Sequence, residues 1–330
     1  MASNQTAHAL WFTAPGQADI LPAMAPPPGP GEVRVRSVVG GISRGTEALV
    51  AAGRVPETEW HRMRCPHQGG TFPFPVKYGY SVAGVVEDGP PECPSDWLDA
   101  PVFCLHPHQT RFTVPIADII RIPAAVPLRR AVLAPQIETA LNATWDAAPR
   151  PGDRIAVVGG GVIGCLVAWL CAGIPGCAVQ LIDIDPSRSA TAQHLGVPFA
   201  APGPAAMPGC DLVFHTSASA AGLALALSLA GLEATVVELS WYGAGAIPAG
   251  LGGAFHSQRL TLRASQVGMV APDRRARWDG PRRLALALSL AADPRLDALL
   301  QSGTAFEGLP AALPAILGQP GALCHRVEYT

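Results

Sequence analysis

Three glycines and one aspartate carry the clearest chemical signal in the sequence. Gly159, Gly161 and Gly164 satisfy the pattern G-x-G-x-x-G, and Asp183 follows 19 residues after the last of them. In this pattern the first glycine permits a tight turn, the second lets the backbone approach a pyrophosphate, and the third lets a helix pack closely on its strand. An acid at the end of the next strand accepts hydrogen bonds from a ribose 2′-hydroxyl and repels a 2′-phosphate. The spacing therefore predicts a site for NAD(H), with NADP(H) disfavoured.

The residues around these glycines supply the elements that such a site requires. Ile155–Val158 predicts a short strand, Val162 and Ile163 begin an apolar helix, and the run VQLID predicts a second strand that ends in Asp183. Because this stretch contains almost no charged residues, a membrane-spanning helix is the alternative to a nucleotide-binding unit. The adjacent glycines and the Pro175-Gly176 pair divide it into pieces too short to cross a bilayer as one helix.

Composition limits the classes of protein to which the chain can belong. Its 330 residues predict about two domains, and 49% hydrophobic residues can fill their cores. A net charge of −2 offers no basic surface for nucleic acid or anionic lipid, so we expect neither as a partner. The start MASNQTAH lacks the features of a signal peptide, which predicts a cytoplasmic protein. The 8 cysteines form no C-x-x-C pair, and we interpret most of them as small buried apolar residues.

Strand and helix patterns divide the chain into a β-rich part and an α/β part. Residues 1 to about 135 contain short strands, such as Glu32–Val39 and Tyr80–Glu87, separated by turns rich in Pro and Gly. From Arg130 an apolar helix leads to the glycine motif, and strands then alternate with helices. That alternation predicts an α/β fold with a doubly wound parallel sheet.

The order of these segments resembles the medium-chain dehydrogenase/reductase superfamily. The segments that carry the resemblance are PGPGEVRVRSVVGGISRGTE, YGYSVAGVVEDG, RPGDRIAVVGGGVIG and LIDIDPSR. It implies a GroES-like catalytic domain over residues 1–135, a Rossmann NAD-binding domain over 136–270 and a C-terminal return to the catalytic domain over 271–330. Within the superfamily, GISRGTE and GYSVAG resemble the branch that includes 2-desacetyl-2-hydroxyethyl bacteriochlorophyllide a dehydrogenase. The resemblance also implies a homodimer formed by edge pairing of Rossmann sheets.

Zinc-dependent members of this superfamily carry metal ligands where this chain has other residues. The cysteine of G-I-C corresponds to Ser43, and the pair of G-H-E corresponds to Tyr80 and Ser81. The stretch 135–138 has no cysteine to serve as a third ligand, and the structural zinc lobe with its four cysteines is missing. Serine and tyrosine oxygens stay protonated at neutral pH and bind zinc poorly. We therefore expect the usual zinc ions to be absent.

Hydride transfer to or from a carbonyl without zinc still needs a group that holds the oxygen and exchanges its proton. Tyr80 is the first candidate because it occupies the place of a zinc-binding histidine; the alternative is a core tyrosine. Lys77, the single lysine among 23 basic residues, could lower the pKa of Tyr80 if the two face one cavity.

Two histidines and two glutamates form the remaining polar candidates. His106 and His108 lie in FCLHPHQTRF. Three roles fit them: loop histidines with hydrogen-bonded ring nitrogens, a proton relay, or a substrate contact. A metal site would need a further ligand such as Glu47 or Glu138. The resemblance places Glu47 and Glu138 among cleft residues, although an acid on a helix, such as Glu138, is more often capped or paired with a base.

The resemblance also implies further cofactor contacts. Asp183 and Arg188 would flank the adenosine ribose. Other polar or aromatic residues follow two later strands, at the strand ends where open α/β sheets bind ligands: Thr216, Ser217, Ser240, Trp241 and Tyr242. Trp241 and Tyr242 could shield the nicotinamide, line the substrate pocket or simply pack.

These observations favour an NAD(H)-dependent, zinc-independent oxidoreductase that interconverts a small-molecule alcohol and a carbonyl. One alternative keeps the fold but reduces the C=C bond of an enone or quinone with NADPH. Another is a nucleotide-binding sensor or partner protein that has lost catalysis.

Overall fold

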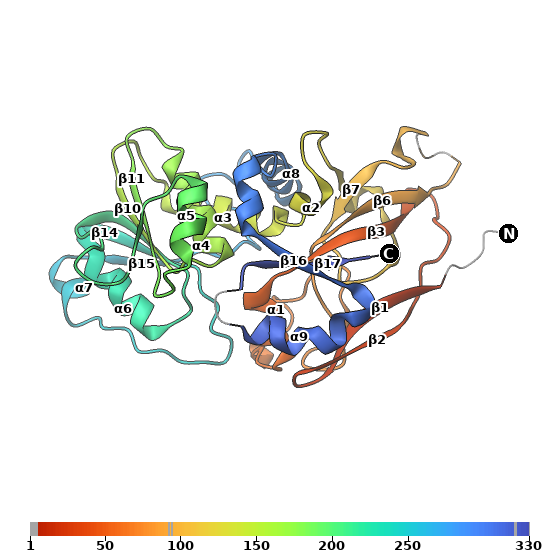
Figure 1. Cartoon of the computed structure of the whole chain (residues 1–330), viewed down its shortest axis with the longest axis horizontal. Coiled ribbons are helices and arrows are strands. Elements are labelled where there is room, and N and C mark those ends of the chain that lie inside the picture. The colour runs from red at the N-terminus through yellow and green to blue at the C-terminus, as the bar shows by residue number, and fades with distance from the viewer. Residues whose placement is uncertain (1–5, 92, 94, 320–321, 330) are drawn as a thin grey trace. The chain divides into compact units, whose positions relative to one another are not determined.

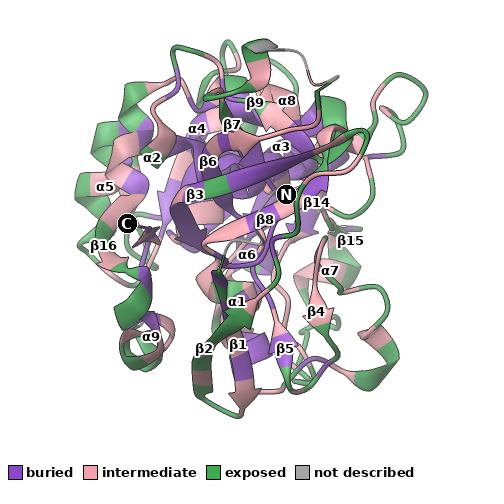
Figure 2. Ribbon diagram, turned by 90° about the vertical axis from the view of Figure 1, so that its right-hand side faces the viewer, coloured by how far each residue is buried: buried purple, intermediate pink, exposed green. Residues whose placement is uncertain are grey.

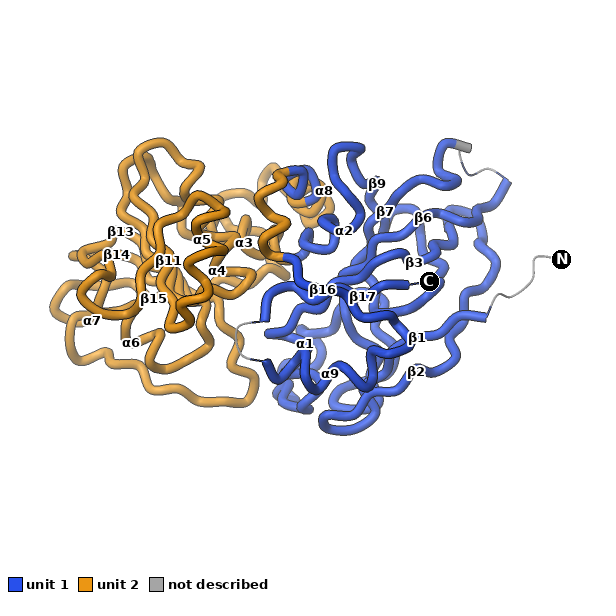
Figure 3. Tube along the Cα trace, viewed as in Figure 1, with its two compact units in different colours: residues 1–135, 288–292, 300–330 blue, residues 136–287, 293–299 orange. Residues whose placement is uncertain are grey.

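The computed structural model describes residues 6–91, 93, 95–319 and 322–329, which fold into two compact units (Figure 3). Unit 1 comprises residues 1–135, 288–292 and 300–330, and unit 2 comprises residues 136–287 and 293–299. The first five residues of MASNQTAH, on which the expectation about a signal peptide rests, lie outside the described residues. Among the described helices, none is both long and apolar enough to span a membrane.

Unit 1 is built on β-sheets. One sheet has the strand order β16-β17-β3-β6-β7-β9, with β8 also paired to β3, and another has the order β2-β1-β5-β4. Figure 1 labels β16, β17, β3, β6 and β7 of the first sheet and β1 and β2 of the second. The strands are β1 (Ala7–Ala14), β2 (Gln17–Ala23), β3 (Glu32–Ile42), β4 (Gly69–Gly70), β5 (Val76–Lys77), β6 (Val82–Asp88), β7 (Pro101–Cys104), β8 (Arg111–Pro115), β9 (Ile119–Arg121), β16 (Leu300–Ala305) and β17 (Cys324–Glu328).

A buried apolar cluster holds the larger sheet of unit 1 together. Val33 and Val35 of β3 pack with Val82 of β6 and with Phe112 and Val114 of β8. Figure 2 shows β3 as a largely buried strand. The C-terminal strand β17 pairs antiparallel with β3, so the end of the chain completes this sheet. Short helices border unit 1: α1 (Arg44–Ala51), α2 (Leu128–Ala131), α9 (Leu309–Gly318) and the 3-10 turns Glu57–Glu59, Ser95–Trp97, Ile116–Asp118 and Phe306–Gly308.

Unit 2 is a parallel sheet with helices packed on it. The strand order is β12-β11-β10-β13-β14-β15, with β10 (Arg154–Val158), β11 (Ala178–Ile182), β12 (Phe199–Ala200), β13 (Cys210–His215), β14 (Ala230–Glu238) and β15 (Thr261–Ala264). The helices are α3 (Ala134–Ala147), α4 (Val162–Ala172), α5 (Arg188–Leu195), α6 (Ala220–Leu229), α7 (Ala254–Ser257) and α8 (Gly280–Leu290), with a 3-10 helix at Pro294–Leu299. This architecture confirms the predicted α/β class with a parallel sheet.

Two element boundaries differ from the prediction. The helix expected from Arg130 is divided into α2 and α3. A continuous helix would bring the ring of Pro135 against the carbonyl group of Ala131, four residues earlier, whereas a proline fits the first turn of a new helix. The strand expected from Tyr80 begins at Val82, because Gly79 adopts a φ of 117° that interrupts extended backbone. Tyr80 therefore lies in a loop.

Candidate functional site

The glycine turn of unit 2 lies between β10 and the N-terminus of α4. Gly159 has a φ of 113°, in the region that side chains rarely adopt, and a side chain at Gly164 would collide with the carbonyl oxygen of Gly159. At Gly161, by contrast, an added Cβ would have none of the described heavy atoms within 4 Å. The turn is thus closed on the protein side and open beside the first residues of α4, Val162 and Ile163. This is a cradle suited to a pyrophosphate at a helix N-terminus.

Asp183 directly follows β11 and its carboxyl group supports the glycine turn. One carboxyl oxygen accepts the backbone N–H of Gly160, and the other accepts the N–H of Asp185 at 2.7 Å. A carboxylate oxygen has two lone pairs, so both oxygens retain capacity for a ribose hydroxyl. Asp183 is therefore fixed beside the turn, where an adenosine ribose would lie.

Arg188 opens helix α5 and packs on the same turn. A Cβ added to Gly160 would lie 3.1 Å from Cγ of Arg188 and 3.2 Å from Asp183 Oδ2. The buried Arg188 Nε lies 3.5 Å from Asp185 Oδ2, an ion-pair distance without hydrogen-bond geometry. The aliphatic stem of Arg188 thus forms one wall of the turn.

Thr216 holds the glycine turn from the neighbouring strand. It follows β13, and its hydroxyl donates to the carbonyl oxygen of Gly159 at 2.8 Å and to that of Val158 at 3.1 Å. The single hydroxyl proton of Thr216 is therefore engaged by backbone carbonyl oxygens, and this side chain shapes the turn.

A buried histidine links the polar residues that follow β13 and β14. His215 and Glu238 are paired in register at the carboxyl ends of these strands. His215 Nδ1 lies 2.7 Å from Glu238 Oε2, and His215 Nε2 lies 2.7 Å from the hydroxyl of Ser217. Burial alone would raise the pKa of Glu238, but hydrogen bonds from His215 and Ser240 outweigh it and hold that pKa below its usual range.

The residues after β14 join the same network. Ser240 donates its N–H to Glu238 Oε1 at 2.7 Å, and its hydroxyl accepts the N–H of Ala218 at 3.1 Å. The hydroxyl of Tyr242 donates to Glu238 Oε2 at 3.0 Å, and burial raises the pKa of that hydroxyl. Trp241 is partly buried. The predicted residues Ser217, Ser240 and Tyr242 thus converge on His215 and Glu238.

Sequence reasoning missed His215 and Glu238. The signal that could have identified them is their position, since each is the last residue of a strand in a parallel sheet and directly follows an apolar run. Polar groups at the carboxyl ends of neighbouring parallel strands meet at one edge.

The side chains of Tyr80 and Ser43 are hydrogen-bonded to each other in unit 1. The hydroxyl of Tyr80 donates to Ser43 Oγ at 2.6 Å. Burial raises the pKa of Tyr80 to about 12, although the hydroxyls of Ser43 and Thr46 oppose this effect. Tyr80 therefore remains protonated at neutral pH and can donate a hydrogen bond. The buried thiol of Cys65, which the sequence did not single out, is also kept protonated, because burial raises its pKa to about 12.

Glu47 and His108 form a fully buried pair beside them. Glu47 Oε2 lies 3.1 Å from His108 Nε2, and the exposed fraction of each side chain is 0%. Glu47 Oε1 accepts the N–H of Ser43 at 2.8 Å, which ties the pair to the start of α1. A Cβ at Gly79 would lie 2.8 Å from the His108 ring, so the backbone before Tyr80 rests on this imidazole. The structure therefore gathers Tyr80, Glu47 and His108.

Lys77 does not act on Tyr80 in the way that the sequence suggested. Its amine donates to Gln109 Oε1 at 2.7 Å. The pKa of Tyr80 is raised, not lowered, because burial and the nearby Glu47 and Cys65 outweigh the opposing effect of two hydroxyl groups. The expectation that Lys77 acidifies Tyr80 is therefore wrong, because Gly79 turns the chain between them and Lys77 binds another partner.

His106 and His108 face different surroundings despite their H-P-H spacing. The His106 ring stacks on Phe112 at a centroid distance of 3.8 Å and on His67 at 5.2 Å. Burial holds the pKa of His106 well below its usual range. His106 is thus a neutral, packed ring, whereas His108 pairs with Glu47. Within the described residues, no group of three or more His, Cys, Asp or Glu side chains could hold a metal ion.

Glu138 lies on α3 in unit 2 and pairs with a buried arginine. Its Oε1 accepts a hydrogen bond from Arg283 Nε at 3.0 Å. Burial raises the pKa of Glu138, and the arginine offsets part of that rise. Arg283 also donates to Asn142 and to the carbonyl oxygen of Val267, so Glu138 belongs to a network that fixes α8 and the preceding loop to α3.

Comparison with known proteins places this fold among solved dehydrogenase structures. The sequence matches no protein-family model. A short chain alcohol dehydrogenase from Escherichia coli CFT073, solved with NADH, has a TM-score of 0.75 and 17% identity and matches over 98% of this chain and 99% of its own. The structure of 2R,3R-butanediol dehydrogenase from Bacillus subtilis has a TM-score of 0.76 and 16% identity, and the match covers 98% of this chain and 99% of that one. Galactitol-1-phosphate dehydrogenase from Escherichia coli has a TM-score of 0.74 and 15% identity, and the match covers 97% of this chain and 99% of that one.

These similarities confirm the predicted fold, a GroES-like β domain combined with a Rossmann domain. At such low identities they establish the architecture and not the reaction.

Proposed function

We propose that the protein is an NAD(H)-dependent oxidoreductase of the medium-chain dehydrogenase type that interconverts a small-molecule alcohol and a carbonyl compound. The observation that carries the proposal is the glycine turn, which is open beside Gly161 and supported by Asp183. The NADH-bound structure of similar fold supports it. A bound nicotinamide cofactor would supply or accept the hydride.

The residues of unit 2 would bind the pyrophosphate and the adenosine ribose of that cofactor. Backbone N–H groups at the start of α4 suit the pyrophosphate, and Asp183 suits the ribose hydroxyls. The network of His215 and Glu238 fixes the hydroxyl of Ser217 at the carboxyl end of β13. These groups are held by other protein groups before any ligand arrives, which reduces the entropy lost on binding.

Tyr80 is our candidate for the group that holds the substrate oxygen. Its phenol is protonated at neutral pH, with a pKa of about 12. That value is still below that of bulk water, about 15.7, so the phenol can give a proton to a developing alkoxide. In the free protein Tyr80 donates to Ser43; with a carbonyl present, Tyr80 could donate to the carbonyl while the Ser43 hydroxyl donates to Tyr80. Ser43 would then stabilise charge on the phenol oxygen.

The donor set around Tyr80 does not fit a zinc ion of the usual kind. Ser43 and Tyr80 hydrogen-bond to each other, and the pKa of Tyr80 is raised, so its oxygen is less available as an anionic ligand. The hydroxyl of Ser81 donates to the carbonyl oxygen of Val132 at 2.7 Å. We therefore propose a reaction in which Tyr80, not zinc, polarises the carbonyl.

The test of this proposal is turnover by chelator-treated protein. We expect protein dialysed against a chelator to hold well below one zinc per chain and still to oxidise NADH with members of a panel of aldehydes and ketones. The reason is that Ser43, Tyr80 and Ser81 all serve other hydrogen bonds. Elemental analysis and the loss of absorbance of NADH measure the two quantities.

The same panel separates the alternatives. Faster turnover with enones or quinones and NADPH would replace our proposal with a C=C reductase. Tight NADH binding without hydride transfer to any compound would favour a nucleotide sensor. Restoration of activity by stoichiometric zinc would show that the metal is required after all.

A further inference from the structure

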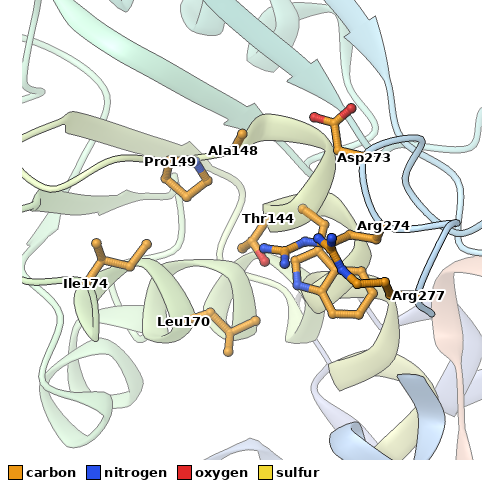
Figure 4. Close-up of a pocket in the computed structure, with 9 residues that line it drawn as sticks. Thr144, Ala148, Pro149, Leu170, Ile174, Asp273, Arg274 and Arg277 are labelled. Carbon is orange, nitrogen blue, oxygen red and sulfur yellow. The ribbon is translucent and has the colours of Figure 1, made fainter. Parts of the chain in front are cut away.

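Unit 2 contains a cavity away from the glycine turn. It has a volume of about 400 Å³, within the range of small-molecule sites. Its walls come from α3, the end of α4 and the loop before α8 (Figure 4). Helix α4 begins beside the glycine turn at Val162, whereas its residue Leu170 lines the cavity, eight residues or about 12 Å further along the helix. The proposed nucleotide site does not use this cavity.

Arg274 and Arg277 give the cavity its charge. In Figure 4 their side chains extend toward Thr144, whereas the carboxyl group of Asp273 points away from them. In the part of the chain that the structure describes, neither guanidinium forms an ion pair with a carboxylate. Two guanidinium groups that line one pocket can both donate hydrogen bonds to a single oxyanion.

An indole ring and aliphatic side chains form the rest of the wall. The guanidinium of Arg274 lies 5.4 Å from the ring centroid of Trp145, and Trp278 packs against Trp145 at a centroid distance of 4.9 Å. Arg282 in turn lies 4.1 Å over Trp278. These contacts hold Trp145 in place. Leu170, Ile174 and Pro149 add apolar surface.

We propose that this cavity is a second ligand site, which binds an organic carboxylate or phosphate on a flat apolar body. The anionic group would lie between Arg274 and Arg277, and the body would lie against Trp145 and the aliphatic side chains. The volume suits one or two fused rings with a short acidic arm.

Calorimetric titration of the 330-residue protein with 2-naphthoate tests this proposal. We expect saturable binding that persists in the presence of saturating NADH. The double substitution Arg274→Met and Arg277→Met should weaken binding by about tenfold or more, about 1.4 kcal/mol. Methionine keeps the apolar stem beside the indole and removes the charge.

Two controls separate this site from general charge or hydrophobic effects. Arg275→Met removes an exposed arginine of the same loop that does not line the cavity and whose Nε donates to Val270, so it should change the affinity by less than about twofold. The neutral probe 2-naphthamide should bind at least about tenfold more weakly than 2-naphthoate.

Three results would overturn the proposal: no saturable binding of 2-naphthoate, equal weakening by Arg275→Met, or displacement of the probe by NADH. The last result would assign the probe to the glycine turn. Because the experiment needs no catalysis, failure of the proposed oxidoreductase function would not affect it.

Discussion

Replacing Tyr80 with phenylalanine should lower kcat by about 10²–10⁴, the range expected for loss of a general acid, while folding and NADH affinity stay unchanged. The substitution removes only the hydroxyl that donates to Ser43 at 2.6 Å, and the ring keeps its edge contact with Tyr78 at 6.0 Å. Steady-state turnover and NADH titration of both proteins measure the effect.

Tyr78→Phe is the matched control. Tyr78 is buried beside Tyr80, and its hydroxyl donates to the carbonyl oxygen of Met63 at 3.3 Å. Its loss should change kcat far less. If the Tyr80→Phe variant turned over normally while a His106→Asn or His108→Asn variant with an unchanged thermal midpoint were inactive, the proton would come from the FCLHPHQ segment and our assignment would be wrong.

The second large effect concerns stability. Replacing His108 with alanine should cost about 3–5 kcal/mol of unfolding free energy, because it leaves Oε2 of the buried Glu47 carboxyl group without its partner. For a unit of this size that cost corresponds to a fall of about 6–20 °C in the midpoint of thermal unfolding. Calorimetry or circular dichroism measures the midpoint.

The exposed His61 of the same unit provides the control, and His61→Ala should leave the midpoint nearly unchanged. The double substitution Glu47→Ala and His108→Ala should cost less than the sum of the two single ones, because the second change no longer breaks a pair. Equal midpoints for His108→Ala and the unsubstituted protein would show that the pair is not part of the stabilising core.

The sequence predicted the glycine turn well because that site is local. A strand, a turn and a helix within one stretch set the positions of Gly159, Gly161 and Gly164, and only Asp183 comes from the next strand. The pair of His215 and Glu238 depends instead on the register between β13 and β14, which the residue pattern alone does not specify. Sequence could place both residues at strand ends but could not show that they touch.

The direction of side chains in loops and at the end of the short strand β5 was the main source of error in unit 1. Lys77 and Tyr80 are three residues apart, yet the positive φ of Gly79 between them allows no prediction from strand or helix geometry. For His106 and His108 the sequence left a satisfied loop role, a proton relay, a substrate contact and a metal site open. The structure separates the two residues, because His106 packs against Phe112 and His108 pairs with Glu47. Such choices are made by tertiary packing, which a single sequence does not reveal.

Cofactor binding to the glycine turn is the central claim, and a calorimetric comparison of NADH with NADPH tests it most directly. Asp183 directly follows β11 beside the turn and would accept the 2′-hydroxyl of NADH but repel the 2′-phosphate of NADPH. We predict that NADH binds at least about tenfold more tightly, about 1.4 kcal/mol. Asp183→Ala should narrow that difference, whereas Asp185→Ala, two residues further on, should preserve it. Equal affinities, a preference for NADPH, or no binding of either nucleotide would contradict the account.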